Sequence, residues 1–299
     1  MKRIIITGAT GFIGIHLIKE WLEEDCEIFA VIRPNSKNKS RVPKNEKVHI
    51  IELEMKDYDK LISYTKTADF FYHLAWEGAR KPYRDNEQIQ KRNYKYSLKA
   101  FEAAQRLNCS FFLGSGSQAE YGITTGVVDE EYPCKPETEY GKYKLKTYEM
   151  LSNRSKEVGI KFIWTRIFSV YGKYDYSGTL IMNCLSKMLK NETIEMTEGN
   201  QLWDYVYVKD VAEAMKSFAL TNCSSGVYIV ASGDYRPLRD FIIEMKKVLN
   251  SNSHLAFGCI PFGTGGAINL TPNPQKIKDA LNWMPHTSFP EGIVLTMEK

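Results

Sequence analysis

A tyrosine followed four residues later by a lysine is the spacing in this sequence best suited to proton transfer. Tyr140 and Lys144 have this spacing where a helical pattern opens that runs to Met150, so both side chains would lie on one helix face. A free tyrosine has a pKa of about 10 and needs a neighbouring cation to ionise near neutral pH. Because Lys144 would supply that charge, the pair could move a proton to or from a substrate oxygen.

The same spacing occurs a second time, at Tyr205 and Lys209. About two such spacings are expected by chance in a lysine-rich chain with 18 tyrosines. The alternation of residues 205–208 predicts a strand, along which four residues span roughly 13 Å. Only Tyr140 and Lys144 are therefore expected to act together.

A glycine-rich turn joins a β-branched run at residues 4–7 to an amphipathic pattern over residues 13–24. Its glycines are Gly8, Gly11 and Gly14. Glycine permits a tight turn, close approach of the backbone to a pyrophosphate, and tight packing of the helix on the strand. The helix N-terminus would offer N–H groups and partial positive charge to the phosphates. The turn predicts dinucleotide binding.

The end of the second predicted strand bears on the choice of cofactor. An enzyme selective for NAD usually has a carboxylate there for the ribose 2′-hydroxyl, but Arg33 follows Ile32, with Asn35, Ser36 and Lys37 beyond. A guanidinium pairs with phosphate in a fork, so NADP(H) is favoured over NAD(H). The alternative is that Arg33 merely faces solvent.

These segments need a scaffold of alternating strands and helices. Strands are predicted at residues 4–7, 27–32, 48–53, 69–75, 110–114 and 161–167, mostly with helical patterns between them. Such alternation predicts an α/β fold with a parallel, doubly wound sheet of the Rossmann type.

The regular alternation of predicted strands and helices ends after Ser169. Helices are predicted over residues 178–189 and 238–249 and a strand over 227–230, with proline, glycine and asparagine through 261–274. We expect a dinucleotide-binding domain of residues 1–168 plus about 203–222, to whose sheet residues 205–220 return. The smaller α/β substrate-binding domain would comprise about 169–202 plus 223–299.

Composition excludes several classes of protein. Hydrophobic residues make up 43% and charged residues 25%, which excludes a disordered chain. The net charge is +4, and basic residues are scattered except over residues 37–47, which indicates a solvated loop and no nucleic-acid partner. Six widely spaced cysteines lack zinc-site spacing, so we expect reduced core thiols and no metal. No apolar segment of about 18 residues occurs, which predicts a cytoplasmic protein without a membrane partner.

Taken in order, the motifs resemble the extended short-chain dehydrogenase/reductase family, specifically its epimerase/dehydratase branch that acts on nucleotide sugars. The resemblance runs nearly the whole chain. Its segments are residues 7–14, Tyr72-His73-Leu74-Ala75, residues 115–122 and 140–144, Thr165-Arg166-Ile167-Phe168, residues 204–210, and Leu281-Asn282-Trp283-Met284-Pro285.

The resemblance implies roles by position. The catalytic residues would be Ser117, Tyr140 and Lys144, with Ser117 on the substrate oxygen and Ser115 as the alternative. The implied cofactor-binding residues are Gly8, Thr10, Gly11, Phe12, Ile13, Gly14, Arg33, Glu54, Met55, Leu74, Ala75, Asn93, Tyr140, Lys144 and Ile167. The implied substrate-side residues are Trp76, Ser115, Ser117, Gln118, Ser169 and Trp203. Glu54 and Asn93 could equally be surface or capping residues.

Departures from the family pattern narrow the reaction. Family dehydratases have an Asp-Glu pair after the catalytic hydroxyl residue, whereas Gln118-Ala119 follow Ser117, so elimination of water is not expected. Many relatives have an arginine for the nucleotide phosphates where Trp203 stands, and an asparagine where Ser169 stands. Arg166, Arg236, Arg239, Lys187 or Lys276 could compensate, and Trp203 could simply pack.

The expected reaction is NADPH-dependent reduction of a nucleotide-linked 4-keto-6-deoxyhexose on a route to a surface polysaccharide or glycoconjugate. Tyr140 would donate the proton, and Lys144 would hold the nicotinamide ribose and lower the tyrosine pKa. The alternatives are an NAD-dependent nucleotide-sugar 4-epimerase and, in another class, a non-catalytic dinucleotide-sensing protein. The family also implies a homodimer that pairs through the helix carrying Tyr140 and the helix before it.

Overall fold

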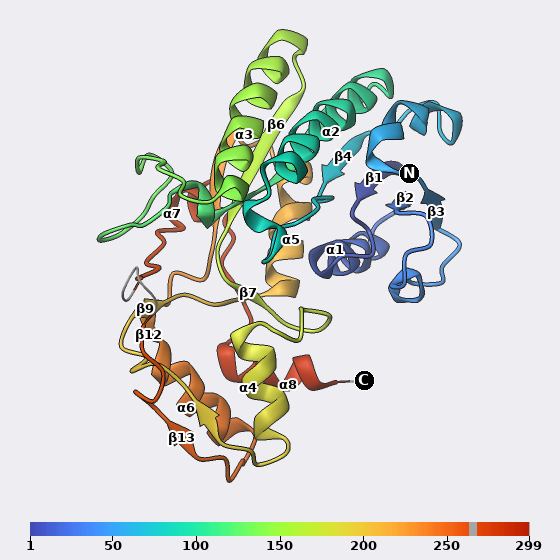
Figure 1. Ribbon diagram of the computed structural model, residues 1–299. Coiled ribbons are helices and arrows are strands. Elements are labelled where there is room, and N and C mark those ends of the chain that lie inside the picture. Colours follow the sequence, from blue (N-terminus) through green and yellow to red (C-terminus); the bar gives the residue numbers. More distant parts are fainter. Residues whose placement is uncertain (263–267, 299) are drawn as a thin grey trace.

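The central feature is a seven-stranded sheet with the order β11-β6-β5-β4-β1-β2-β3, in which all neighbours are parallel (Figure 1). The computed structural model describes residues 1–262 and 268–298. The strands are β1 (Lys2–Thr7), β2 (Cys26–Ile32), β3 (Val48–Glu52), β4 (Phe70–His73), β5 (Phe111–Ser117), β6 (Lys161–Ile167) and β11 (Gly226–Val230). The predicted Rossmann-type α/β fold is confirmed.

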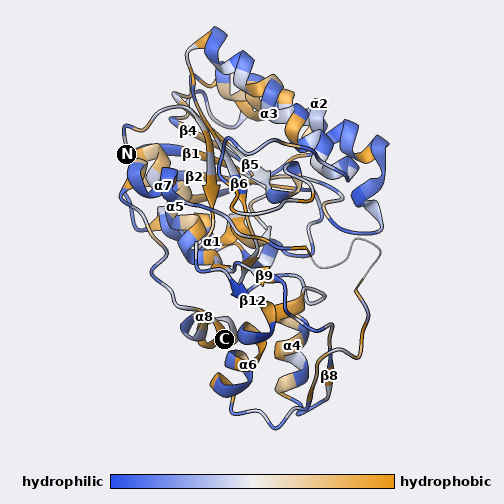
Figure 2. Ribbon diagram, turned by 90° about the vertical axis from the view of Figure 1, so that its left-hand side faces the viewer, coloured by the Kyte–Doolittle hydropathy of each residue, from blue (hydrophilic) through white to orange (hydrophobic). Residues whose placement is uncertain are grey.

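Helices cover both faces of this sheet (Figure 2). One face carries α1 (Phe12–Leu22), α5 (Val208–Leu220) and α7 (Gln275–Leu281), and the other carries η2 (Met55–Ser63), α2 (Glu87–Arg106) and α3 (Glu139–Val158). Each face has its own apolar core, with Trp21 buried on the first and Trp164 on the second. Because both faces are covered, the central strands are apolar throughout rather than alternating.

A third apolar core lies beyond the carboxyl ends of the strands, in the lower part of Figure 1. It is built around residues such as Phe241 and Phe289. Its elements are α4 (Leu180–Met188), α6 (Leu238–Val248), α8 (Phe289–Met297) and the pair β8 (Ile194–Glu195) and β13 (Leu255–Ala256). Two further short pairs lie between the sheet and this core: β7 (Val170–Tyr171) with β10 (Val206–Tyr207), and β9 (Leu202–Trp203) with β12 (Arg236–Pro237).

Two expectations about the chain after residue 200 were wrong. The strand predicted over 227–230 was assigned to the substrate-side unit, but β11 pairs with β6 in the main sheet, because its run is apolar enough for burial between two helical layers. Ile277 and Trp283 likewise pack in the core under α1 and α5. The division into two domains with the remaining boundaries stays a prediction.

The strand predicted over residues 205–208 is also shorter than expected. Only Val206 and Tyr207 pair with β7, and helix α5 begins at Val208, with Asp210 in its first turn. An acidic residue there favours a helix N-terminus. Lys209 is exposed on the helix whereas Tyr205 packs on Phe241 and Phe289 in the third core, so this second Tyr–Lys pair does not act as a unit.

Other expectations concern the surface of the molecule. No helix within residues 1–262 and 268–298 combines the length and the apolar character needed to cross a bilayer. Cys26, Cys109 and Cys184 are buried, whereas Cys259 is exposed and is not the core thiol that was expected. Residues 263–267 of the loop predicted over 261–274 lie outside the described residues.

Candidate active site

The predicted site residues gather at the carboxyl ends of the parallel strands, where open α/β sheets bind their ligands. The glycine turn follows β1. Gly8 has a φ of 68°, and a Cβ there would lie 2.8 Å from the backbone nitrogen of Ala75, in the segment after β4. A Cβ on Gly14 would lie 2.5 Å from the carbonyl oxygen of Gly8. Both positions therefore need glycine for the turn to close against the sheet.

The first turn of α1 is suited to bind an anion. Gly11 is the N-cap, no side chain caps the helix, and the first turn has no acidic residue. The N–H groups of Phe12 and Ile13 have no partner within the helix, since the first amides of any helix lack one. Unpaired amides together with the positive end of the helix dipole fit a diphosphate.

The tip of β2 carries the residues expected to choose the cofactor. Arg33 is exposed, and the Ser36 hydroxyl lies 3.2 Å from the hydroxyl of Thr10 in the glycine turn. The sequence interpretation missed Glu52, which the neighbouring strand β3 brings to this tip, where it accepts hydrogen bonds from the backbone N–H of Asn35 and, at 2.6 Å, from Lys39. The Lys39 hydrogen bond lowers the pKa of Glu52, so its charge is fixed and paired.

Ser117, Tyr140 and Lys144 come together between β5 and α3. The Thr138 side chain caps α3 by accepting a hydrogen bond from the Gly141 N–H, which places Tyr140 in the first turn. The Ser117 side chain, at the end of β5, lies close enough to Tyr140 to lower the pKa of its phenol. The Lys144 ammonium donates a 2.6 Å hydrogen bond to the Ser115 carbonyl.

Trp76, from the segment after β4, completes this group. The Lys144 Nζ lies 3.7 Å from the centre of the Trp76 ring, and the same ring meets Tyr140 edge to face at 6.0 Å. The Trp76 indole N–H donates to the buried Gln90 at 2.8 Å, which holds the ring in place. Trp76, which the sequence predicts on the substrate side, thus lies beside both catalytic candidates.

Burial dominates the acid–base properties of the pair. It lowers the pKa of Lys144 to about 7, and it raises the pKa of Tyr140 above its ordinary value. The Ser117 side chain and the charge of Arg84 act in the opposite direction on the pKa of Tyr140. The lysine alone therefore does not account for the electrostatics of the tyrosine.

Arg84 is a site residue that the sequence interpretation missed. Its guanidinium carbon lies 4.8 Å from the centre of the Tyr140 ring. Arg84 belongs to the short helix η3 (Tyr83–Asp85) in the segment between β4 and α2. No pattern distinguishes it from its neighbours Arg80 and Lys81, because only the fold brings this segment over α3.

A buried ion pair lies behind Ser117. Glu120 accepts a 2.9 Å hydrogen bond from Arg166 on β6, and their side chains are 0% and 4% exposed. Glu120 also accepts hydrogen bonds from the Ser117 backbone N–H at 2.8 Å and from the Trp164 indole at 3.0 Å. Burial raises the pKa of Glu120, and the charge of Arg166 opposes that shift.

Several candidates occupy less direct positions. Asn93 is buried, and its amide bonds both the N–H and the carbonyl of Glu77, so it holds the segment after β4. Glu54 is exposed at the start of η2, and Met55 follows it half-buried. The remaining candidates, which are half-buried at strand ends or beside the short strand pairs, are Leu74, Ala75, Ile167, Ser169, Gln118 and Trp203.

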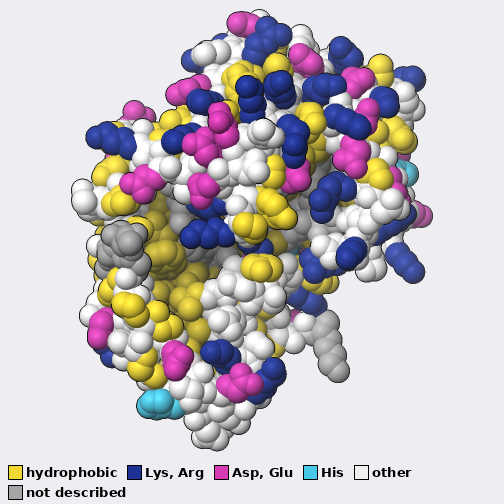
Figure 3. Space-filling view, in the orientation of Figure 1, with side chains coloured by type: hydrophobic (Ala, Val, Ile, Leu, Met, Phe, Trp, Pro, Cys, Tyr) yellow, Lys and Arg dark blue, Asp and Glu magenta, His cyan; other side chains and the backbone are white. Residues whose placement is uncertain are grey.

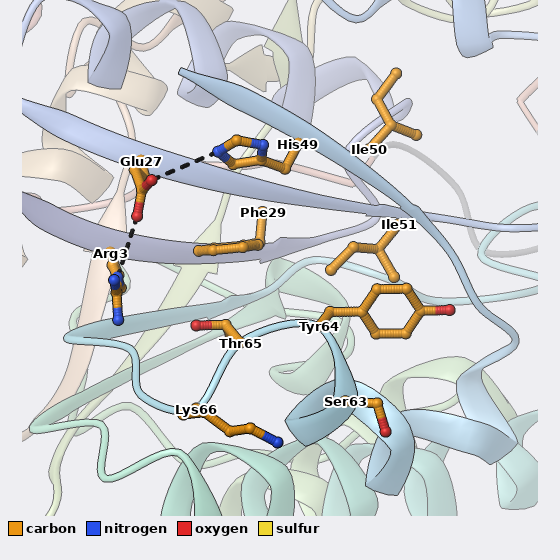
Figure 4. Close-up of a pocket in the computed structure, with 10 residues that line it drawn as sticks. All are labelled: Arg3, Glu27, Phe29, His49, Ile50, Ile51, Ser63, Tyr64, Thr65 and Lys66. Carbon is orange, nitrogen blue, oxygen red and sulfur yellow. Dashed lines mark hydrogen bonds and ion pairs between the residues drawn. The ribbon is translucent and has the colours of Figure 1, made fainter. Parts of the chain in front are cut away.

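The molecular surface is hollowed beside β9 and β12, where Figure 3 shows hydrophobic side chains in the recess and basic ones near its rim. A separate groove of about 490 Å³ lies at the amino ends of β1, β2 and β3 (Figure 4). There Glu27 pairs with Arg3 and lies 3.7 Å from His49. No predicted site residue lines that groove, and it faces away from the ligand-binding edge of the sheet.

Comparison with known proteins agrees with this geometry. The profile of the NAD-dependent epimerase/dehydratase family matches residues 4–231, a span from the glycine turn through Ser117, Tyr140 and Lys144 to the end of β11. The chain belongs to this family. It is therefore an enzyme of an NAD-dependent family. The alternative of a non-catalytic dinucleotide-sensing protein is no longer a candidate.

Individual relatives are distant. CDP-abequose synthase of Salmonella muenchen is 25% identical over 98% of this chain and 96% of its own. The dTDP-6-deoxy-L-talose 4-dehydrogenase (NAD(+)) of Aggregatibacter actinomycetemcomitans is 24% identical over 81% of this chain and 88% of its own. UDP-N-acetylglucosamine 4-epimerase from Methanobrevibacter ruminantium, solved with UDP-N-acetylmuramic acid, superposes with a TM-score of 0.89 at 23% identity over 99% of this chain and 96% of its own. At that identity the superposition shows the fold.

Proposed function

We propose that the protein is an NADPH-dependent reductase of a nucleotide-linked 4-keto-6-deoxyhexose. The observation that carries the proposal is that Ser117, Tyr140 and Lys144 lie together beside the carboxyl end of β5. The end of β2, which Arg33 follows, lies at the same edge of the sheet. One relative is named for the 4-position of a dTDP-linked 6-deoxy sugar, and another for a CDP-linked sugar.

The residues present fit the cofactor. The uncapped first turn of α1 would hold the diphosphate, and Arg33 with Ser36 and Lys37 would hold the 2′-phosphate. Glu52 does not oppose this assignment, because Lys39 already pairs with it. Lys144 would hold the nicotinamide ribose. When bound, NADPH supplies the hydride.

The side chains around the substrate would handle the proton. The Tyr140 phenol donates its proton to the sugar oxygen as the keto carbon is reduced, while the Ser117 hydroxyl holds that oxygen. Arg84 and Lys144 stabilise the phenolate that remains. In the oxidative direction the phenolate is the base that accepts the proton.

Loss of water is not part of the proposed reaction. Gln118 and Ala119 follow Ser117, and neither can act as an acid or base. Glu120 is the next carboxylate along the chain, but it is enclosed by Arg166, Trp164 and the Ser117 amide. It is therefore engaged behind Ser117 rather than free to reach a substrate carbon.

The second candidate is an NAD-dependent nucleotide-sugar 4-epimerase. It is favoured by the likeness of the whole chain to a solved 4-epimerase. The same tyrosine, lysine and serine could serve both reactions, because both move a hydride and a proton at one carbon. An epimerase keeps its cofactor through both half-reactions, whereas a reductase exchanges it at each turnover.

We further propose that two copies pair through α2 and α3. A groove of about 420 Å³ runs between these helices. Its lining combines apolar and charged side chains, among them Tyr94, Met150, Lys95 and Glu149. Such a surface can be buried in a homodimer while its charges remain at the rim.

One set of measurements tests the proposed reaction. Fresh protein is checked for bound nucleotide by absorbance and mass, and stripped protein is then assayed with NADPH and a panel of 4-keto nucleotide sugars. Tyr140→Phe should lower the turnover rate by roughly 10²- to 10⁴-fold while NADPH binding is retained. The exposed Tyr64→Phe is the matched control. Co-purified NAD, with turnover in its presence alone, would replace the reductase by the epimerase.

A further inference from the structure

The segment between β4 and α2 carries two arginines that contact different parts of the molecule. Arg84 lies over the ring of Tyr140. Arg80 reaches the segment between β7 and α4, where its Nη2 lies 3.1 Å from Oδ1 of Asp175. Its guanidinium carbon also lies 4.5 Å from the centre of the Tyr176 ring. The ion pair therefore joins the segment that borders Tyr140 to the residues that lead into α4.

Asp175 is the more firmly held partner of this pair. Its side chain is 3% exposed, whereas that of Arg80 is 53% exposed. Its carboxylate accepts hydrogen bonds from the Tyr176 N–H at 2.6 Å and from the hydroxyl of Thr179, the N-cap of α4, at 2.8 Å. Burial raises the pKa of Asp175, and these hydrogen bonds and the charge of Arg80 oppose that shift. Because a buried carboxylate is stabilised by a cation, Asp175 gives the Arg80 side chain a defined place to bind.

The ion pair is attached directly to the peptide that holds Arg84. The carbonyl of Ala79, which belongs to the peptide between residues 79 and 80, accepts a 3.2 Å hydrogen bond from Nη1 of Arg84. The carbonyl of Arg80 accepts a 3.0 Å hydrogen bond from the Tyr83 N–H, which closes a turn. The position of the 79–80 peptide thus decides where the Arg84 guanidinium can lie.

Other contacts hold the backbone on either side of this peptide. The Gln90 amide donates to the carbonyls of Gly78 at 2.9 Å and of Tyr83 at 3.2 Å. Between them, Arg80 makes the only ion pair that the described residues show for positions 79–84. Loss of this ion pair would free residues 79–82, and with them the carbonyl that Arg84 uses, while the flanking backbone stays in place.

Both arginines influence the tyrosine. Burial raises the pKa of Tyr140, and the charges of Arg84 and, to a smaller extent, Arg80 oppose that shift. A change at Arg80 can therefore reach Tyr140 by the loss of its own charge or through a displaced Arg84. The two routes differ in a double-variant cycle, because independent effects add whereas effects through a shared group do not.

We propose that Arg80 and Asp175 are positioning residues for the reaction at Tyr140: their ion pair fixes the 79–80 peptide, and this peptide holds Arg84 against the tyrosine ring. The inference rests on the proposed function, because it takes Tyr140 as the proton donor. Neither Arg80 nor Asp175 needs to touch the substrate in this role. Their loss should therefore lower kcat and leave KM nearly unchanged.

The first experiment measures the segment itself, by hydrogen exchange of the full chain with detection by mass spectrometry. Arg80→Gln and Asp175→Asn should each make the amides of residues 79–84 exchange about twofold to fivefold faster, with α6 unchanged. Arg80→Lys keeps the charge and should exchange at a rate between those of the wild type and Arg80→Gln. Arg154→Gln, an exposed arginine paired with Glu157, is the control and should exchange as the wild type does in this segment.

The second experiment measures the route to Tyr140, through steady-state rates of the reduction or epimerisation that the wild type catalyses. Arg80→Gln should lower kcat about twofold with KM within about twofold of the wild type, and Arg80→Lys should recover most of the loss. The double variant Arg80→Gln/Arg84→Gln should be no slower than Arg84→Gln alone, because the peptide then has no guanidinium to hold.

The outcomes separate this inference from the proposed function. Unchanged hydrogen exchange in both Arg80→Gln and Asp175→Asn overturns the inference, whatever the reaction. Losses in kcat that multiply in the double variant also overturn it, because Arg80 would then act by its own charge. In both cases an active wild type leaves the proposed function standing. A wild type that turns over no nucleotide sugar overturns the proposed function, and the assigned role at Tyr140 fails with it.

Discussion

The guanidinium of Arg84 stacks on the ring of Tyr140, with 4.8 Å between the guanidinium carbon and the ring centre. A hydrogen bond from its Nη1 to the Ala79 carbonyl helps to hold it there. The Lys144 Nζ lies farther away, 5.7 Å from the centre of the same ring. Because burial lowers the pKa of Lys144 to about 7, the lysine loses its charge as pH rises through that value, whereas the arginine stays charged.

Arg84→Gln should therefore raise the pKa of Tyr140. In the oxidative direction the phenolate is the base, so the rising limb of kcat against pH should move to higher pH. In the reductive direction the weaker acid should lower kcat about twofold to fivefold, the size of a cation–π contact of ~0.5–1 kcal/mol. Steady-state rates across pH with Arg84→Gln and the Arg154→Gln control measure both effects. Unchanged profiles would show that Arg84 is only a packing residue.

The placement of Tyr140 and Lys144 on one helix could be predicted from the sequence because it depends only on residues that lie close together in the chain. Tyr140 and Lys144 are one helical turn apart, and α3 begins at Glu139, beside them. The glycine turn is local in the same way, since its spacing fixes both a strand end and a helix start. Periodicity over a dozen residues is enough to predict such elements.

The features that were missed depend on contacts between distant segments. Glu120 and Arg166 are 46 residues apart, and their pairing follows from β5 lying next to β6. The apolar run of β11 permits burial in more than one core, and no local pattern encodes that it pairs with β6 in the main sheet. Arg236 faces Trp203 only because the short strands β9 and β12 pair. Local propensity cannot predict any of these contacts.

Cofactor preference should depend on the tip of β2. Arg33 is exposed and has no carboxylate partner among the described residues. Removal of a guanidinium that pairs with the 2′-phosphate should cost a charged hydrogen bond, so Arg33→Ala should weaken NADPH binding roughly tenfold or more. NADH lacks that phosphate, and its affinity should change less than about twofold. Titration calorimetry of stripped protein with both cofactors measures the ratio, and Arg106→Ala at the far end of α2 is a suitable control. A constant ratio would remove the case for NADP(H).

The homodimer can be tested at the groove between α2 and α3. Met150 lines it from α3 and is only half-buried in the single chain. Met150→Arg would place a positive charge beside Lys95 and Lys146 in the middle of the proposed interface, where like charges repel and an unpaired charge is strongly unfavourable. Light scattering coupled to size exclusion should show a dimer for the wild type at micromolar concentration and a monomer for the variant. Glu157→Asp near the end of α3 should remain dimeric, and a monomeric wild type would contradict the proposal.

The buried pair of Glu120 and Arg166 should matter more for stability than any surface ion pair in the molecule. Removal of one partner leaves the other as an uncompensated buried charge, so Arg166→Met should lower the free energy of unfolding by about 3–5 kcal/mol. Glu120→Gln should cost a similar amount: the amide oxygen can still accept from the Ser117 N–H and the Trp164 indole, but Arg166 keeps its buried charge without a partner. Urea unfolding monitored by tryptophan fluorescence measures both values.

The double variant Glu120→Gln/Arg166→Met shows whether the lower free energy of unfolding comes from an unpaired buried charge. If the main cost is an unpaired charge, removing both charges should restore part of the stability, and the two single effects should not add. Glu120→Gln should also raise KM more than it lowers kcat, because Ser117 would remain present but less firmly held. A loss below about 1 kcal/mol in Arg166→Met would be the value of an exposed pair. The 0% and 4% exposure of the two side chains argues against that value, because water cannot reach the charge left behind.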